Sequence, residues 1–416
     1  MLYLLKNAWA LLLGMLLLMI GNGVQGTLLG IRGSIEGFSP DIMSYLMSAY
    51  MVGMLVGSQV APILIKNVGH VRVFAALASL ISASFLGFAL FVDPVAWFIL
   101  RLFVGFCFSG VYVASESWLN EAASNSNRGK AMSVYMIVQM SGILLAQVLI
   151  NFGDPTSFVP FAIISVLVSI SFAPILLSVG RVPIVSTSQR MGLKALFKAS
   201  PLGSITMILI GGVFSLLFGM SAVYGSEKAL SVKEISLLVG SIYVAGVFFQ
   251  YPVGFVSDRV DRRKLIILLS LIGFIGVALG LIFHDNFYFL LLTFFIVGGV
   301  ANPVYSVVIA YTNDYLDSNE MSSAAGGLVF MSGVGGVIVP VITGQLMGIF
   351  GPESLLVILC TIFCTIVMYG IYRSTKRSII DIDSSTTHVA IMPQATNVAV
   401  EISQEAANAE SPNSND

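Results

Sequence analysis

The chain has 416 residues, of which 57% are hydrophobic and only 10% charged, and its formal net charge is −1. Soluble domains carry roughly 45–50% apolar and 25% charged residues, so this composition excludes a soluble globular protein and indicates a polytopic α-helical membrane protein. A net charge so close to zero offers no electrostatic attraction for nucleic acid, and we expect none to bind.

Apolar stretches of about 18–25 residues, each long enough to cross a bilayer, recur along the chain. Basic residues collect in alternate loops, whereas the opposite set of loops holds only Arg32, Lys228 and Lys233, which predicts that both termini are cytoplasmic. The predicted spans are 8–29, 41–65, 71–92, 95–119, 131–150, 158–180, 203–224, 234–257, 265–284, 287–312, 324–349 and 354–373.

The long connection after the sixth span divides the chain into an N-terminal six-helix half, 1–180, and a C-terminal six-helix half, 203–373. Within the linker 181–202, the stretch MGLKALFKAS alternates apolar and basic residues at helical spacing, which predicts a short amphipathic cytoplasmic segment. Residues 374–416 are rich in Ser, Asn, Ala and Glu, which predicts a disordered cytoplasmic tail.

The two halves resemble each other when the second is shifted back by about 193 residues. In that register Tyr50 matches Tyr243, Tyr112 matches Tyr305, and Gly142 matches Gly335. One register held across several helices predicts a duplicated six-helix unit with a solute site between the halves near the bilayer midplane.

The fourth span carries two charged residues, Arg101 and Glu116, which lie on one helical stripe with Gly105 and Tyr112. A charge at bilayer depth costs roughly 2.5–3.5 kcal/mol or more, so both should face a protein interior or a wet cavity. The two residues are fifteen positions apart, which is about 22 Å along a helix, so they form two separate sites, or stations, and do not pair directly.

Each of these charges has more than one interpretation. Glu116 is either a protonatable coupling residue or a gate residue that pairs with Lys66 or Arg72. Arg101 is either an anchor for an anionic group, or a modulator of a proton site, or a residue that rigidifies its half by bonding to carbonyls of neighbouring helices.

Amide and phenol side chains within the spans are candidate solute ligands, although each one singly can equally serve an interhelical hydrogen bond. The candidates for the solute cavity are Asn22, Gln25, Gln59, Tyr112, Gln139, Gln250, Asn302 and Tyr305. The three cysteines lie in apolar runs and are interpreted as packing residues.

The loop after the eighth span reads GFVSDRVDRRK, from Gly254 to Lys264. A glycine permits close helix approach, while Asp258, Arg259 and Arg262 supply opposite charges for a cytoplasmic gate. This loop resembles the G-x-x-x-D-R-x-G-R-R signature of the major facilitator superfamily, with Asp261 where glycine is usual.

The matching loop of the first half, around Lys66 and Arg72, has a lysine in place of the signature aspartate. That substitution, together with Arg101, Glu116 and the run QYPVG that begins at Gln250, resembles the YcaD-like branch of the superfamily. The resemblance covers about residues 8–373 and implies an all-α integral membrane protein with the major-facilitator fold, about twelve transmembrane helices in two pseudo-symmetric halves.

Two comparisons with the superfamily bear on mechanism. The spacing Arg101-x-x-x-Gly105 resembles a fourth-helix arginine motif that is often linked to proton coupling. The fifth-helix Gly-Pro-x-x-Gly-Gly motif of drug/proton antiporters is missing, because residues 131–150 contain no proline. The resemblance therefore favours symport over antiport.

We expect a secondary active transporter, a monomer in the bacterial cytoplasmic membrane, that moves a small organic solute together with protons by alternating access. The alternatives are a proton-coupled efflux antiporter and a transporter-like membrane sensor that binds a solute without moving it. The sequence shows no Walker loop, metal-ligand cluster or nucleophile–base pair, so we expect neither an enzyme nor a bound cofactor or metal.

Overall fold

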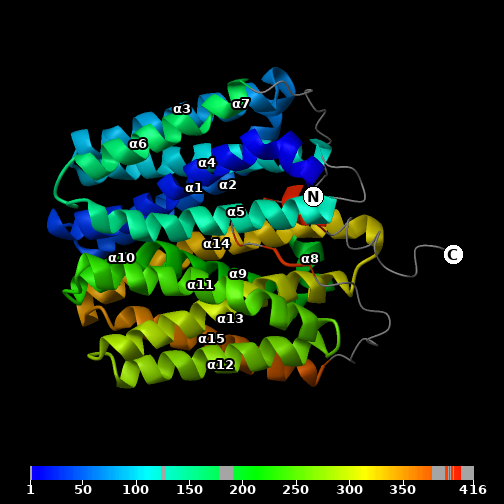
Figure 1. Cartoon of the computed structure of the whole chain (residues 1–416). Coiled ribbons are helices and arrows are strands. Elements are labelled where there is room, and N and C mark those ends of the chain that lie inside the picture. Colours follow the sequence, from blue (N-terminus) through cyan, green and yellow to red (C-terminus); the bar gives the residue numbers. More distant parts are fainter. Residues whose placement is uncertain are drawn as a thin grey trace. The chain divides into compact units, whose positions relative to one another are not determined.

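The computed structural model describes residues 2–122, 128–177 and 191–376, and in the tail 389–391, 393, 395–396 and 398–403. Twelve helical stretches in this part of the chain are long and apolar enough to cross a membrane, as predicted (Figure 1). The first seven helices are α1 (Leu2–Ile35), α2 (Pro40–Val68), α3 (His70–Leu90), α4 (Pro94–Ala122), α5 (Arg128–Leu149), α6 (Val159–Ser171) and α7 (Ala173–Leu177).

The second half begins with a short helix, α8 (Leu193–Ala199), which lies within the predicted amphipathic segment and buries Leu196. The remaining helices are α9 (Pro201–Ser215), α10 (Ser221–Glu227), α11 (Val232–Ser257), α12 (Arg262–Ile282), α13 (Phe287–Asn313), α14 (Ser318–Phe350) and α15 (Ser354–Ser374).

The predicted repeat is visible in where helices begin. α2 begins at Pro40 and α11 at Val232, α4 at Pro94 and α13 at Phe287, all close to the 193-residue shift. Each of these helices starts beside a turn residue or a proline, which cannot continue a preceding helix but is tolerated in a first turn. Both halves therefore follow one plan of helix lengths and connections.

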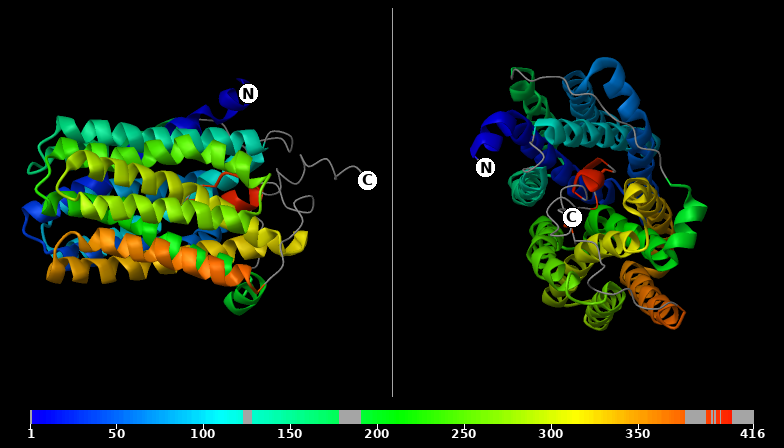
Figure 2. Two further views of the ribbon diagram at one scale, coloured as in Figure 1. Left: turned by 90° about the horizontal axis from the view of Figure 1, so that it is seen from below. Right: turned by 90° about the vertical axis from the view of Figure 1, so that its right-hand side faces the viewer.

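The chain forms two compact units. Unit 1 comprises residues 1–187 and 218–239, and unit 2 comprises 188–217 and 240–416. In unit 1, α1 packs on α5 and α6, α2 packs on α4, and α3 packs on α4 and α6. In unit 2, α9 packs on α13 and α14, and α12 packs on α13 and α15. Within each unit the helices run side by side, as the two views of Figure 2 show.

These units differ from the predicted halves because unit 1 also contains residues 218–239 of the second repeat. There α10 packs against α1, so closely that a Cβ on Gly30 would lie 2.6 Å from the Cβ of Ala222. The Asn151 Nδ2 also donates to the Ser236 hydroxyl at 2.9 Å. The ends of the seventh and eighth spans that are predicted to lie outside the cell thus pack on the first repeat.

The seventh span is not a uniform α-helix. Between α9 and α10 it contains a π-helical turn, Leu216–Met220, and the boundary between the units falls inside that turn, at Leu217 and Phe218. A π-turn weakens the regular hydrogen-bond ladder and often marks a functional site. The seventh span is therefore irregular at the boundary between the two units.

The tail differs from what its average composition predicts. Residues 398–403 are helical, and the side chains of Ala399, Val400 and Ile402 are buried, as is Ile391. The stretch from Val389 to Ile402 is locally apolar, and an average over 374–416 hides that run. Disorder therefore does not describe this part of the tail.

Candidate functional site: a buried arginine cluster and a charged gate

The first candidate site lies where α2 and α4 approach each other most closely. A Cβ on Gly105 of α4 would collide with the backbone of Tyr50, and one on Gly53 of α2 would collide with the Leu102 carbonyl. Only glycine permits this backbone approach. The contact places the ring of Tyr50 beside the side chain of Arg101, one helical turn from Gly105.

Arg101 is buried, and its guanidinium carbon lies 5.2 Å from the centroid of the Tyr50 ring. Its Nη2 contacts the sulfur of Met47, and its Nε has no hydrogen-bond partner in the described part of the chain. No carboxylate among the described residues lies within ion-pair distance of it. Arg101 is therefore a desolvated cation held by a ring face and a thioether.

A chain of polar contacts extends from this arginine to α1. The Tyr50 hydroxyl donates to the Asn22 Oδ1 at 3.4 Å, and the Asn22 Nδ2 donates to the Tyr112 hydroxyl at 3.1 Å. The ring of Phe108 lies between the two tyrosines, with centroids 6.3 Å and 6.0 Å away. We call Asn22, Tyr50, Arg101 and Tyr112 the arginine cluster; it brings together three predicted site residues.

Gln25 lies one turn from Asn22 on α1 and is buried, yet neither amide atom has a hydrogen-bond partner among the described residues. An unpaired buried amide costs about 1–3 kcal/mol, so this side chain is suited to bind a polar group that enters from outside. Gln59 lies apart: it is exposed, and it donates to the Leu55 carbonyl of its own helix at 3.5 Å.

Glu116 is fully buried near the far end of α4 and lies within electrostatic range of Tyr135 on α5. Gln139, another predicted ligand, is buried one turn from Tyr135 on the same helix. Lys66 and Arg72, the gate partners predicted for Glu116, are exposed and form no ion pair with any described residue. The predicted gate pair of Glu116 is therefore not formed in this structure.

In unit 2 the predicted ligands lie on α11 and α13. The Gln250 Nε2 donates to the Ser306 hydroxyl at 2.8 Å. Asn302 is buried but donates to the Gly298 carbonyl of its own helix at 3.0 Å. Tyr305 is buried with its ring edge-to-face against Phe214, the centroids 5.7 Å apart. Gln250 and Ser306 are thus the pair that joins two helices here.

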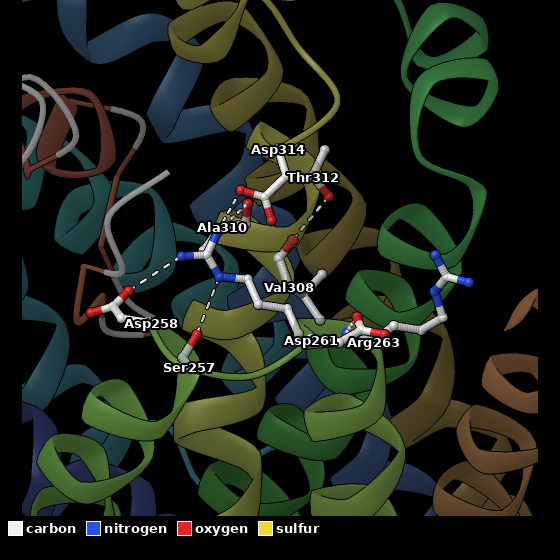
Figure 3. A network of polar contacts seen from close by, with 9 residues as sticks. Ser257, Asp258, Asp261, Arg263, Val308, Ala310, Thr312 and Asp314 are labelled. Atoms are coloured by element: carbon white, nitrogen blue, oxygen red, sulfur yellow. Dashed lines mark hydrogen bonds and ion pairs between the residues drawn. The ribbon is translucent and has the colours of Figure 1, made fainter. Parts of the chain in front are cut away.

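The predicted gate residue Arg262 is the centre of a buried network at the end of unit 2 where α11, α12 and α13 meet. Its Nη1 lies 2.5 Å from the Asp314 Oδ1, and its Nη2 lies 3.3 Å from the Asp258 Oδ1. Figure 3 shows Ser257, Asp258, Ala310 and Asp314 converging on this guanidinium. The side chains of Arg262 and Asp314 are only 3% and 7% exposed, so this is a buried ion pair.

The neighbouring loop residues have distinct roles. Asp261, where the family signature has glycine, caps α12 by accepting from the Arg263 backbone N–H at 3.0 Å (Figure 3). Arg259 is exposed, and its guanidinium covers the ring of Phe255 at 3.5 Å from the centroid. Gly254 is buried in the last turns of α11. We call Asp258, Arg262 and Asp314 the gate network.

Sequence reasoning missed the residues that complete both sites. Tyr50 holds Arg101, Asp314 pairs with Arg262, and Tyr135 lies near Glu116. The repeat contained a signal for two of them, because Tyr50 matches Tyr243 and Asp314 matches Glu121. Within the described residues, no group of three or more histidine, cysteine or acidic side chains is arranged to hold a metal ion.

Comparison with known proteins agrees with this architecture. The family model of the Major Facilitator Superfamily matches residues 11–233 and 204–381. The MFS-type transporter YcaD of Escherichia coli O139:H28, described as uncharacterized, is 24% identical over 354 residues, which cover 85% of this chain and 92% of that protein. The YcaD protein of Escherichia fergusonii is 23% identical over 356 residues, with the same coverage.

Two solved structures share the fold. The nucleoside transporter NupG superposes with a TM-score of 0.74 at 14% identity, covering 89% of this chain and all of that one. A bacterial homolog of the human lysosomal transporter Spinster, in an inward-facing and unoccupied conformation, superposes with a TM-score of 0.69 at 12% identity, covering 98% and 97% of the two chains. With the family model matching most of the chain and twelve spanning helices in place, the protein belongs to the major facilitator superfamily and is a YcaD-like, multi-pass secondary transporter.

Proposed function

We propose that this transporter moves a small organic solute bearing an anionic group into a bacterial cell by proton symport across the cytoplasmic membrane. The observation that carries the proposal is Arg101, a buried guanidinium whose described neighbours include an aromatic ring and a sulfur atom but no carboxylate. An ion removed from water costs several kcal/mol unless a counterion and hydrogen bonds compensate for the loss. A solute carboxylate would supply both.

The rest of the arginine cluster supports a small polar or zwitterionic solute. Asn22 and Tyr112 offer a hydrogen-bonded amide and phenol beside the guanidinium, and Gln25 offers an unpaired amide one turn away. Nucleosides, the solutes named for NupG, are neutral molecules, whereas the unpaired guanidinium favours an anion. We therefore assign a monoanionic or zwitterionic solute to this protein and not a nucleoside.

Glu116 is the proposed proton carrier. It is a fully buried carboxylic acid on α4, the kind of group that can take up and release a proton as a solute moves. Lys66 and Arg72 are exposed and form no ion pair with a described residue, which argues against these two residues as its gate partners. Proton coupling would then depend on Glu116, which lies in the first repeat but apart from the arginine cluster.

Alternating access is the proposed route. The contacts of α10 with α1 and of Ser236 with Asn151 would close the outer side, and the gate network would open and close the cytoplasmic side. This assignment of sides follows the basic residues of alternate loops, which place both termini in the cytoplasm. The protein would work as a monomer, because each six-helix repeat supplies half of the pathway.

The test begins with a thermal-shift screen of the purified protein against matched neutral, cationic and anionic metabolites, because a bound solute stabilises the fold by mass action. We expect the stabilising compounds to be anions or zwitterions. Uptake of a stabilising compound into proteoliposomes should then rise when a proton gradient is imposed inward. Glu116→Gln should abolish this gradient dependence but leave solute exchange across the membrane intact.

Three outcomes would redirect the proposal. Stabilisation by neutral compounds alone would remove the anion-anchor role of Arg101. Solute accumulation driven by an outward proton gradient would indicate an efflux antiporter. Binding without any transport would indicate a transporter-like sensor. Arg72→Ala is the matched control for Glu116→Gln, since it removes an exposed charge and should leave gradient-driven uptake unchanged.

A further inference from the structure

The hydroxyl of Ser306 on α13 is a small polar site within unit 2 that part of the chain's own tail occupies. It accepts from the Gln250 Nε2 at 2.8 Å and from the Ile391 backbone N–H at 3.0 Å, and it donates to the Ile391 carbonyl at 3.0 Å. A hydroxyl offers one donor and two acceptor positions, so all its hydrogen-bonding capacity is used. Two of these three bonds are made by the tail.

Several apolar side chains of the described tail are also buried. Ile391 is 3% exposed, and the short helix at 398–403 (red in Figure 2) buries Val400 and Ile402 completely or nearly so. This apolar content distinguishes 389–403 from a solvated polar tail, which has nothing to bury.

We propose that the described tail residues, 389–391, 393, 395–396 and 398–403, form a reversible plug, which binds the Gln250–Ser306 site through the backbone of Ile391 and withholds it from solute. The three hydrogen bonds of Ser306 occupy all its positions, so a solute that needs this hydroxyl must displace Ile391 or Gln250. The plug's inhibitory effect rests on the proposed transport function, whereas its binding to Ser306 does not. The tail would therefore lower the affinity of the Gln250–Ser306 site for a solute.

The first experiment tests the contact by disulfide formation in the full-length chain. The three native cysteines are replaced by serine, and Ser306→Cys is combined with Ile391→Cys. Because the Ser306 hydroxyl lies 3.0 Å from the backbone of Ile391, the two Cα atoms are close enough for a disulfide to span them, and the pair should cross-link on mild oxidation. Cross-linking in most molecules, detected by mass spectrometry, is expected; its absence under oxidation would overturn the proposal. Each single cysteine serves as the control.

The second experiment measures protection of the tail with a hydrophilic methanethiosulfonate reagent. Ile391→Cys alone, with Ser306 intact, should react at least tenfold more slowly in the native protein than after unfolding in SDS. Adding Ser306→Ala, which removes the anchoring hydroxyl but fits the same space, should raise the native rate severalfold. A native rate equal to the unfolded rate, or no effect of Ser306→Ala, would contradict the plug. Thr361→Ala, an exposed hydroxyl on α15, is the matched control.

The third experiment distinguishes binding of the tail from its effect on solute affinity. A chain ending at Ser385 should gain affinity for the compounds that stabilise the full-length protein, and a synthetic peptide of residues 386–405 should reverse that gain. Unchanged affinity would show that the tail binds without inhibiting. If no compound stabilises either chain, the proposed transport function fails, while the cross-link still reports whether the tail occupies Ser306.

Discussion

The two repeats share a backbone plan but place their charges differently. In the first repeat the buried charges lie along α4, at Arg101 and Glu116, whereas the equivalent positions on α13 are the buried Phe294 and Ile309. In the second repeat the buried charge lies at the helix ends, where Arg262 pairs with Asp314, whereas Lys66 and Arg72 of the first repeat are exposed.

This difference indicates a division of labour. A buried ion pair is stable only as a pair, so the gate network is suited to hold helix ends together and release them as a unit. A buried unpaired cation is suited to receive a counterion, so the arginine cluster is suited to bind. The two repeats thus share a common frame and differ in where their charges lie. Four predictions test whether the gate network stabilises the fold and whether the arginine cluster binds solute.

The largest effect is expected in the gate network. Arg262→Ala would leave Asp314 buried without its partner, and breaking a buried ion pair costs about 3–5 kcal/mol. The free energy of unfolding, measured by titration with SDS in mild detergent, should fall by that amount. Arg259→Ala in the same loop and Arg72→Ala in the first repeat remove exposed cations and should each change it by about 0.5 kcal/mol or less. Equal effects of all three would contradict the assignment of a buried latch to the second repeat.

The next largest effect is expected at Arg101, on binding and not on folding. Arg101→Met replaces an unpaired buried cation by an apolar side chain of similar length, so the unfolding free energy of the empty protein should not fall. Affinity for an anionic solute should fall roughly 10- to 150-fold, because a hydrogen bond to a charged group contributes about 1.5–3 kcal/mol. Isothermal titration of both proteins measures this change.

Phe294→Met is the matched control, because it changes the equivalent position of the second repeat. It should alter solute affinity little and cost less than about 1.5 kcal/mol of stability. A comparable loss of affinity in Arg101→Met and Phe294→Met would remove the functional difference between the repeats.

The sequence was sufficient to predict the membrane-spanning architecture and the two stations of α4. Span number follows from apolar length, and the separation of Arg101 from Glu116 follows from helical rise, so neither depends on tertiary detail. The partners of the charges could not be predicted. The rotation of each helix about its axis decides which side chains meet. In soluble helices the buried face is revealed by the alternation of apolar and polar residues. In a membrane protein that alternation is weak, because lipid-facing and interior positions are both apolar.

Particular residues show this limit. Tyr50 meets Arg101 only because the glycines at 53 and 105 allow α2 and α4 to touch. The two residues are 51 positions apart in the sequence. Asp314 meets Arg262 across a similar separation. Gln59 and Gln25 are both amides in predicted spans, yet one is exposed and the other buried without a partner. In the tail, the local apolar run from Val389 to Ile402 predicts the observed burial better than the polar average composition of residues 374–416 does.

A third prediction uses the equivalent glycines Gly105 and Gly298. A Cβ on Gly105 would collide with the Tyr50 carbonyl, and one on Gly298 would lie 2.5 Å from the Ile242 carbonyl. Gly105→Ala and Gly298→Ala should each destabilise by about 1–3 kcal/mol, because backbone must move in both. Only Gly105→Ala moves the ring that holds Arg101, so it alone should weaken solute binding. Thermal unfolding and titration of both variants measure the two effects; similar binding losses would count against a site confined to the first repeat.

The smallest effects on stability are expected from substitutions of the tyrosines around Arg101. The order of these effects shows whether the Tyr50 ring or its hydroxyl holds Arg101. Tyr50→Leu removes the ring beneath the guanidinium and should cost about 1–2 kcal/mol of stability, the range for a desolvated cation–π contact. Tyr112→Phe loses the 3.1 Å hydrogen bond from Asn22 and the weak 3.5 Å bond to the Met19 sulfur, or about 0.5–1.5 kcal/mol. Tyr50→Phe keeps the ring and loses only a 3.4 Å bond, so it should be nearly neutral.

The second repeat again supplies the control. Tyr243, the equivalent of Tyr50, has Phe294 and not an arginine at the equivalent position, so Tyr243→Leu lacks the cation–π loss. Chemical denaturation of the four variants should therefore place Tyr50→Leu as more costly than Tyr243→Leu. If Tyr50→Phe proved as costly as Tyr50→Leu, the hydroxyl and not the ring face would hold Arg101, and the cation would depend on the hydrogen bonds of Asn22 for its position.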